Sequence, residues 1–208
     1  MDLYLFDYDK TLYAYDSRKR LPAQSMLSGV SQYHLASTWW VPGYERRAEA
    51  GEWPTAAEYL DKFAEVTGAR LTIDQWAQSR KAASKPNPGV VDALRRAKTL
   101  GTVSLLSNNP SPFLETLPAV APDVASILDG NVLVSFMLGV RKPAAEAFEL
   151  ALAKYNADPS DTFFVDDSAE NVAGARAVGI TAHHFTGETA EAVASLNRAI
   201  DDFAGRSR

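Results

Sequence analysis

The sequence predicts an α/β protein, with a parallel sheet core and an α-helical segment inserted after the first strand. The short apolar run at residues 3–6 (LYLF) is typical of a strand that is buried on both faces. From residue 86 onward, strand patterns alternate with helix patterns, which favours right-handed βαβ units. Between these parts, residues 15–85 show helical signals and few strand candidates.

The length, charge and composition of the chain limit the class of protein to which it belongs. Its 208 residues suffice for one core domain with a smaller inserted module. Lys and Arg number 21 against 26 Asp and Glu, so the net charge of −5 gives no general attraction for nucleic acid or for an anionic membrane. The absence of cysteine excludes disulfides, thiolate catalysis and zinc–thiolate sites. Because the N-terminus lacks a basic region and no apolar run approaches the roughly 18 residues of a membrane span, we expect a cytoplasmic protein.

Two carboxylates follow the first strand. Asp7 and Asp9 lie two residues apart, and in an extended chain that spacing directs both side chains to the same side. Two anions in one small space repel each other unless a cation or a shared proton relieves them. A divalent metal ion is one interpretation. The other is a strand that ends in a polar turn, since Asp is common in turns.

Two capped helices are predicted within the inserted segment. Thr55 begins a helix with apolar residues at helical spacing, and Gly68 ends it. Thr72 caps a second helix. The large aromatic side chains of this segment favour the packing of a small helical module over a ligand pocket, and they include Trp39, Trp40 and Trp53.

The inserted segment ends at two prolines in residues 85–89 (KPNPG), which forbid a continuing helix and predict a hinge or linker. The later elements follow from apolar patterns with Gly or Pro near their ends. They are a helix from 90 to about 101, a strand at 102–106, a helix at 143–155, a strand at 162–165, a helix at 168–178, a strand at 180–185 and a helix at 189–203.

Polar residues gather at the ends of these elements. In a parallel sheet, ligands bind beyond the carboxyl ends of the strands. The candidates are Asp7 and Asp9 with Thr11, the turn Ser107-Asn108-Asn109, Lys142 before a helix, and Asp166-Asp167 after a strand. Each of them alone is also explained as a turn, a surface lysine or a helix cap. Together, several carboxylates, one lysine and an anion-binding turn at one sheet edge are what magnesium-assisted phosphoryl transfer requires.

The four polar groups resemble, in order, the four motifs of the haloacid dehalogenase (HAD) superfamily. Residues 7–11 (DYDKT) are similar to the first motif, DxDxT, Ser107 to the second, Lys142 in GVRKP to the third, and Asp166-Asp167 in FFVDDSAENVAGA to the fourth. The resemblance implies a Rossmann-like core of residues 1–14 and 86–208, with an α-helical cap domain at residues 15–85. The longer matches are most similar to the branch that includes sugar phosphatases, nucleotidases and 2-haloacid dehalogenases.

The resemblance implies a role for each motif residue. Asp7 is then the nucleophile that forms an aspartyl-phosphate, which water hydrolyses. Asp9 protonates the leaving alcohol and later deprotonates that water. Ser107 and Asn108 hold phosphoryl oxygens, and Lys142 offsets the charge of nucleophile and phosphate.

A Mg²⁺ site is also implied. The ion is expected to bind the Asp7 carboxylate, the Asp9 main-chain carbonyl and Asp167, with Asp166 touching a coordinated water. One position departs from the family pattern, because Lys10 stands where many members have glycine. If that position needs a positive φ, lysine is disfavoured there.

The function predicted from this resemblance is a Mg-dependent phosphatase acting on a small phosphomonoester, of the sugar phosphate or nucleotide class. Dehalogenases of the family attack carbon and do not need an acid two residues after the nucleophile, so Asp9 favours phosphate chemistry. The alternatives are a phosphomutase, a 2-haloacid dehalogenase or a non-catalytic binding module. The last of these has no need to keep Asp7, Asp9 and Lys142. The sequence predicts no oligomeric state.

Candidates for contact with the leaving group come from the aromatic and arginine residues near or within the cap segment. They are Tyr13, Tyr15, Arg18, Trp39, Trp40, Tyr44 and Arg46. A packing role is the alternative for each. His34, His183 and His184 receive no role, and the last two are expected to end the final strand.

Overall fold

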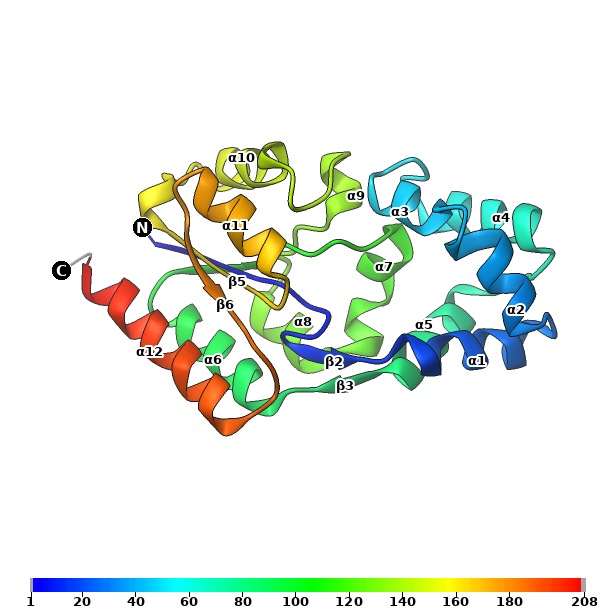
Figure 1. Cartoon of the computed structure of the whole chain (residues 1–208), viewed down its shortest axis with the longest axis horizontal. Helices are drawn as coiled ribbons and strands as arrows, with labels where there is room; N and C mark the ends of the chain where they lie inside the picture. The colour runs from blue at the N-terminus through cyan, green and yellow to red at the C-terminus, as the bar shows by residue number, and fades with distance from the viewer. Residues whose placement is uncertain (1, 207–208) are drawn as a thin grey trace.

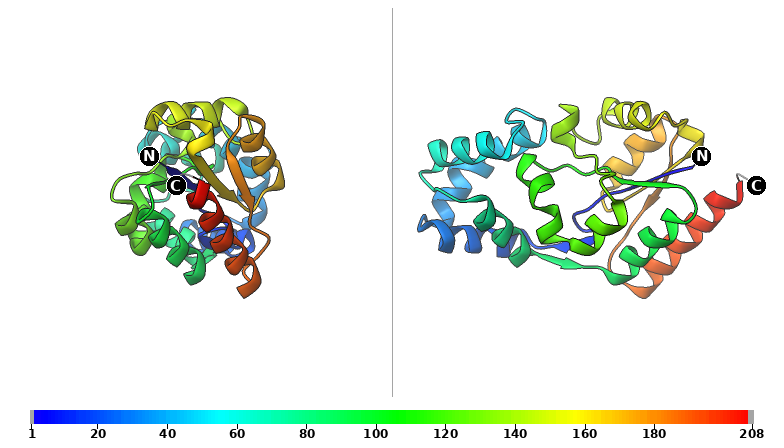
Figure 2. Two further views of the ribbon diagram at one scale, coloured as in Figure 1. Left: turned by 90° about the vertical axis from the view of Figure 1, so that its left-hand side faces the viewer. Right: turned by 180° about the vertical axis from the view of Figure 1, so that it is seen from behind.

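The computed structural model describes residues 2–206. Met1 and residues 207–208, where the predicted core segments 1–14 and 86–208 begin and end, lie outside the described residues. The molecule is elongated, with a parallel sheet and its helices at one end and the helices of residues 17–83 at the other (Figures 1 and 2). This architecture confirms the predicted α/β class.

Four parallel strands form the sheet within the described residues. Their order is β4 (Thr102–Leu105), β1 (Leu3–Phe6), β5 (Thr162–Asp166) and β6 (Thr181–His184). β1 is central, since Phe6 lies opposite Leu105 of β4 on one side and Val165 of β5 on the other. Each strand ends within one residue of its predicted limits, and His184 ends β6 as expected.

β1 is buried on both faces because its alternate side chains enter different apolar clusters. The helices that cover the sheet are α6 (Pro88–Lys98), α10 (Ala145–Tyr155), α11 (Ala169–Ala177) and α12 (Ala190–Arg206). Tyr4 and Phe6 pack in the cluster that holds α6 and α12. Leu3 and Leu5 pack in the cluster that holds α10 and α11. The uninterrupted apolar run therefore matches its position in the middle of the sheet.

The predicted helices around the sheet form with small shifts at their ends. α10 begins at Ala145, two residues after the predicted start, because residues 141–144 form a turn closed by a hydrogen bond from the Ala144 N–H to the Arg141 carbonyl. The sequence interpretation did not define the shorter helices between β4 and β5. They are α7 (Ser111–Val120), α8 (Pro122–Leu128), α9 (Ser135–Leu138) and the 3₁₀ helix η2 (Pro159–Asp161).

Residues 17–83 are almost wholly helical. They form α1 (Ser17–Ser28), α2 (Gln32–Leu35), the π-helix η1 (Ala36–Trp40), α3 (Tyr44–Glu49), α4 (Ala56–Thr67) and α5 (Ile73–Ala83). The two helices predicted from their caps are confirmed. Thr55 and Glu58 form a capping box at α4, Thr72 and Gln75 form another at α5, and Gly68 ends α4 with φ 70°.

At residues 85–89, where a hinge or linker was predicted, the helix ends as expected and a short strand that was not predicted follows. Lys85 and Pro86 lie in β3 (Ser84–Pro86), which pairs antiparallel with β2 (Tyr13–Tyr15). Pro86 is the last residue of the strand and Pro88 the first of α6, positions where a missing N–H is tolerated. The result is a two-stranded ribbon that leads from the sheet to α1 and α5 (Figure 1).

The helical part and the sheet share one apolar core. Trp39, Tyr59 and Trp76 are fully buried in the same cluster as Phe113 of α7 and Phe6 of β1. α5 and α4 pack on α7 to join the two parts. Among the helices of residues 2–206, none is long and apolar enough to cross a membrane.

Candidate active site

Asp7 stands directly after β1, at the carboxyl edge of the sheet. Its N–H donates to the Val165 carbonyl at 2.9 Å, which continues the strand pairing and fixes the backbone. The residue is only 6% exposed, and its Oδ1 accepts from Lys142 Nζ at 2.8 Å and from Ser107 Oγ at 2.9 Å. Three of the four predicted motifs therefore meet at one oxygen atom.

Lys142 connects the first and fourth motifs. Its Nζ donates to Asp7 Oδ1, to Asp166 Oδ2 at 2.6 Å and to the Leu106 carbonyl at 2.6 Å, which uses all three ammonium protons. The residue is 2% exposed. Burial alone lowers the pKa of Lys142, but the two carboxylates outweigh burial and hold that pKa above its ordinary value. The side chain is therefore a fixed positive charge beside Asp7.

Asp166 is the fully buried last residue of β5. Besides Lys142, its carboxylate accepts from the Ser168 N–H at 2.8 Å and from Asn171 Nδ2 at 3.1 and 3.0 Å. Asn171 was not singled out from the sequence. The pattern that could have marked Asn171 is the helix cap, because Ser168 caps α11 and accepts from the N–H of Asn171, three residues later.

A three-carboxylate cluster lies at this edge of the sheet. Asp7, Asp166 and Asp167 each offer an oxygen within 4.8 Å of the others. Burial raises the pKa of Asp7 to about 7, and Asp166 and Asp9 also raise it while Lys142 acts in the opposite direction. Burial and Asp166 raise the pKa of Asp167 as well. Oxygen donors with excess negative charge are the ligand set that suits Mg²⁺, so these residues fit the predicted ion.

Asp9 faces the helical part of the molecule. Arg80 of α5 donates from Nη2 to both Asp9 oxygens, at 2.8 and 2.9 Å, and Asn109 Nδ2 donates to Oδ2 at 3.2 Å. Arg80 is 2% exposed, and its guanidinium lies 4.7 Å from the Tyr15 ring centre and 5.5 Å from that of Phe113. The predicted acid–base residue is thus held by a residue of the predicted cap.

Sequence reasoning missed Arg80 and did not predict the contact between Asn109 and Asp9. Arg80 lies one turn after Trp76 on the buried face of α5, and an arginine on an apolar face is the signal that marks it. Asn109 belongs to the turn after β4 that was named as a candidate, but Asn108 was assigned the phosphate contact. The partner of Arg80 is 71 residues away, which no local pattern shows.

Asn108 joins two loops through its side chain. Its Nδ2 donates to the Lys142 carbonyl at 2.9 Å, and its Oδ1 accepts from the Lys142 N–H at 3.0 Å. This reciprocal pair holds the backbone of Lys142 beside the turn after β4. The side-chain amide is therefore engaged with protein in this structure.

Lys10 adopts the left-handed conformation, with φ 61°. Its N–H donates to the Tyr13 carbonyl at 2.6 Å across a tight turn. Lys10 therefore occupies a backbone conformation that favours glycine, the residue that many family members have at this position.

Two adjoining cavities lie over these residues. One, of about 350 Å³, is lined by Asp7, Asp9, Ser107, Lys142 and Asp167 among others. The second, of about 310 Å³, extends from Asp9 towards α1 and α3. In its wall, Arg141 Nε lies 2.6 Å from Glu49 Oε2, and burial raises the pKa of Glu49 to about 7.

The cap residues named from the sequence divide into two groups. Those that line a cavity are Tyr15, Arg18, Trp40 and Arg46. The other three pack in the apolar core, where Trp39 stacks on Tyr44 and Tyr13 stacks on Tyr8. Packing is therefore the observed role of Tyr13, Trp39 and Tyr44, whereas the other four residues face a cavity.

A family model for haloacid dehalogenase-like hydrolases matches residues 1–179. The chain belongs to this family of enzymes. The match covers all four motifs, and the resemblance stated from the sequence is thereby confirmed.

Two solved HAD structures have the same fold. An HAD family enzyme from Bacteroides thetaiotaomicron, in complex with magnesium and inorganic phosphate, is 22% identical with a TM-score of 0.73, covering 88% of this chain and 93% of that one. A predicted HAD-like hydrolase from Porphyromonas gingivalis is 19% identical with a TM-score of 0.77, covering 95% and 97%. At these identities the likeness shows the fold.

One curated relative is more similar in sequence. The sesquiterpene phosphatase astK of Aspergillus oryzae is 33% identical over 103 residues, which are 49% of this chain and 52% of that protein. The chain thus matches about half the length of this curated relative.

Proposed function

We propose that the protein is a Mg²⁺-dependent phosphatase that hydrolyses a small phosphomonoester through an aspartyl-phosphate on Asp7. The observation that carries the proposal is the position of Asp7. Its carboxylate lines a cavity, is held at one oxygen by Lys142 and Ser107, and has a second acid two residues away. The phosphatase relative, and the HAD relative with magnesium and phosphate, support the same chemistry.

Asp7 Oδ2 is the atom that we assign to attack, since Oδ1 accepts two hydrogen bonds. Attack forms the bond from Oδ2 to phosphorus and breaks the bond from phosphorus to the ester oxygen. Asp9 gives its proton to the leaving alkoxide. A water molecule then loses a proton to Asp9 and attacks phosphorus, which releases inorganic phosphate and restores Asp7.

The groups around Asp7 stabilise this transfer. Lys142 carries a fixed positive charge against the nucleophile and the phosphoryl oxygens. Ser107 lines the cavity and orients Asp7 by donating its hydroxyl hydrogen bond to Asp7 Oδ1. Because the side-chain amide of Asn108 is engaged with Lys142, we assign any phosphate contact of Asn108 to its main-chain N–H.

Mg²⁺ would be held by the Asp7 and Asp167 carboxylates and the Asp9 main-chain carbonyl, with Asp166 on a coordinated water. When bound, the ion neutralises the negative charge of carboxylates and phosphate. Asp166 also positions Lys142, and Asn171 holds Asp166 in place for that purpose.

We further propose that residues 15–85 act as a cap over the core formed by residues 1–14 and 86–208. The β2–β3 ribbon leads to this helical part, and four of its elements, α1, η1, α3 and α5, contribute residues to the cavity beside Asp9. A phosphomutase would need the same residues but would exclude water from the phospho-enzyme. Its product, an isomer without free phosphate, distinguishes it.

The proposal is tested by phosphate release from a panel of phosphomonoesters. The panel comprises sugar phosphates, nucleotides, alkyl phosphates and an aryl phosphate, assayed with Mg²⁺ and again after chelation. We expect the wild type to release phosphate only with Mg²⁺. Asp7→Asn is expected to be inactive, while Asp61→Asn on the exposed face of α4 keeps activity. Full activity of Asp7→Asn would remove the nucleophile from this account.

A further inference from the structure

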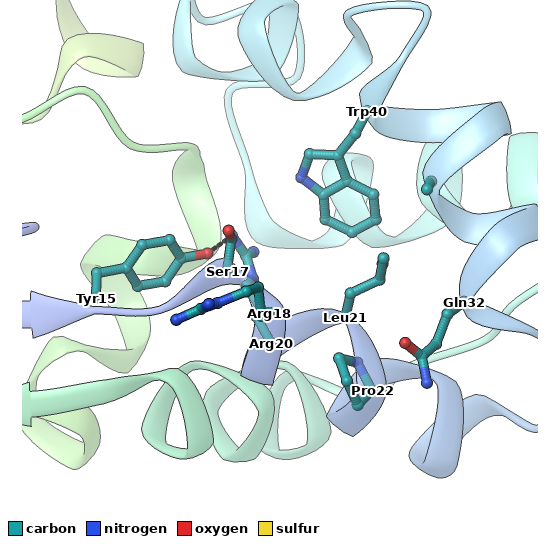
Figure 3. A pocket seen from close by; sticks show the side chains of 9 residues that line it. Tyr15, Ser17, Arg18, Arg20, Leu21, Pro22, Gln32 and Trp40 are labelled. Carbon is teal, nitrogen blue, oxygen red and sulfur yellow. Dashed lines mark hydrogen bonds between the residues drawn. The ribbon is translucent and has the colours of Figure 1, made fainter.

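A third cavity, apolar in character, lies within the helical part. Its volume is about 430 Å³, within the range of roughly 300–1,000 Å³ that is typical of small-molecule pockets. Leu21 and Pro22 of α1 form one wall, and Trp40 of η1 lies over them (Figure 3). Ala36, one turn before Trp40, lines it as well. Carbon atoms therefore supply most of the lining.

The apolar cavity adjoins the cavities over the catalytic residues. Tyr15, Ser17, Arg20 and Trp40 line both the apolar cavity and the cavity that holds Asp9. Tyr15 and Ser17 also line the cavity at Asp7. A ligand with its phosphate at the carboxyl edge of the sheet can therefore extend past Tyr15 into apolar space.

The two arginines that line this space already have carboxylate partners, since Arg18 pairs with Asp16 and Arg20 with Glu45. Arg20 is 4% exposed, and its Nη1 donates to Glu45 Oε1 at 3.2 Å and to the Tyr15 hydroxyl at 3.3 Å. Its guanidinium lies 5.1 Å from the Trp76 ring centre and 5.9 Å from that of Trp40. The Nε and Nη2 atoms of Arg20 are buried without a hydrogen-bond partner. A second anionic group of a ligand would share Arg20 with Glu45, whereas a hydrocarbon group meets ring faces and methylenes.

Three large apolar side chains on or beside the helices that line the cavity are exposed. Met26 stands one turn beyond Pro22 on α1 and is 83% exposed. Tyr33, next to the lining residue Gln32, is 83% exposed, and Val41, next to Trp40, is 80% exposed.

We infer that this cavity binds the hydrocarbon part of the leaving group, so that the substrate is the phosphomonoester of an apolar alcohol and not of a sugar or nucleoside. The inference rests on the proposed phosphatase function for its chemistry and on the apolar cavity for its specificity. The catalytic steps are those given above. Only the alcohol that leaves is specified here.

The first test measures kcat/KM for ethyl, butyl, hexyl and octyl phosphate. Each methylene group buried in apolar space favours binding, so we expect kcat/KM to rise about three- to fourfold per CH₂ until the cavity is filled. Glucose phosphate and a nucleoside monophosphate are expected to fall well below octyl phosphate. Phosphate release with no dependence on chain length would overturn the inference and leave the phosphatase proposal standing.

The second test measures binding without turnover. Calorimetry compares octylphosphonate with ethylphosphonate, two probes that cannot be hydrolysed. We expect tighter binding of the longer probe to wild type and loss of that preference in Ala36→Phe, whose ring fills the cavity. Leu21→Gln adds a polar group to the wall at similar size and is expected to weaken the preference.

Ala57→Phe, on the exposed face of α4, is the matched control and should keep the preference for the longer probe. Length-dependent binding without any phosphate release would contradict the proposed phosphatase and retain the apolar site. Equal binding of both probes to wild type, or unchanged preference in both cavity variants, would overturn the inference.

Discussion

Asp9 and its two donors show how single residues join distant parts of the chain. Arg80 comes from α5 and Asn109 from the turn after β4, and both donate to the Asp9 carboxylate. With both oxygens of Asp9 engaged by Arg80, its orientation depends on a helix of the proposed cap. Arg80 is therefore a positioning residue for the proposed acid–base group.

Replacing Arg80 with Met keeps an apolar chain against the surrounding rings and removes the hydrogen bonds. We expect kcat/KM to fall by about tenfold to a hundredfold, because a small displacement of a reacting group has effects of that size. Stability should fall by roughly 1–2 kcal/mol, less than for a fully buried pair because Asp9 is 24% exposed. Enzyme kinetics and urea unfolding measure the two effects.

Arg80→Lys is expected to recover part of the activity, since one ammonium contact to Asp9 remains possible. Arg70→Met, at an exposed position, serves as the control. Unchanged kinetics in Arg80→Met would show that the pair with Asp9 has no role in positioning.

Lys10 provides a second prediction at the residue scale. Its left-handed conformation costs about 1–2 kcal/mol for a residue with a Cβ, and glycine avoids that cost but loses more chain entropy on folding. Lys10→Gly should therefore raise the free energy of unfolding by up to about 1 kcal/mol. Lys10→Ala keeps the strain and should give no gain. Equal values for the two variants in urea unfolding would contradict this assignment of strain.

Among the elements, those with strong local signals were predicted well and those that depend on pairing were not. The capping residues Thr55 and Thr72 defined α4 and α5, and the apolar run of β1 defined the central strand. The β2–β3 ribbon was missed because Pro86, followed by Pro88, looks like a helix breaker when the partner strand, about 70 residues away, is not known. The same distance in sequence hid the contact between Arg80 and Asp9.

The contact between α3 and α9 gives a prediction at the element scale. Gly51 follows α3 with φ 85°, and a Cβ there would lie 2.6 Å from the Phe136 carbonyl oxygen. Gly43 has φ 84° and open space around its Cβ position. Gly51→Ala should destabilise the protein by roughly 1–3 kcal/mol more than Gly43→Ala, because only the first adds a backbone clash to the same strain.

Thermal or urea unfolding of both alanine variants isolates this difference. If Gly51→Ala and Gly43→Ala lose the same stability, the close approach of the helical part to α9 does not exist in solution.

At the scale of the whole molecule, the packing of the two parts brings ionisable groups of both into the cavity beside Asp9. Glu49 of α3 faces Arg141, which lowers its pKa, and Glu45 and Asp9, which raise it. Burial is the largest effect and raises the pKa of Glu49 from 4.5 to about 7. Between these values the folded state binds a proton that the unfolded chain has released, so this residue's contribution to stability falls as pH rises.

Glu49→Gln removes that titration. Its unfolding free energy should therefore fall less than that of the wild type between about pH 5 and about pH 8, by an amount on the order of 3 kcal/mol at most. Glu146→Gln, at an exposed position of α10, should follow the wild type. Parallel curves for Glu49→Gln and wild type in urea unfolding would contradict the raised pKa.

The most direct test of the central claim is detection of phosphate on Asp7. The protein is mixed with Mg²⁺ and a turned-over phosphomonoester, quenched rapidly in acid, digested and analysed by mass spectrometry. We expect the peptide that contains Asp7 to carry one phosphoryl group in the wild type and none in Asp7→Asn. Continued phosphate release with an unmodified Asp7 peptide, and with activity retained in Asp7→Asn, would contradict the aspartyl-phosphate mechanism.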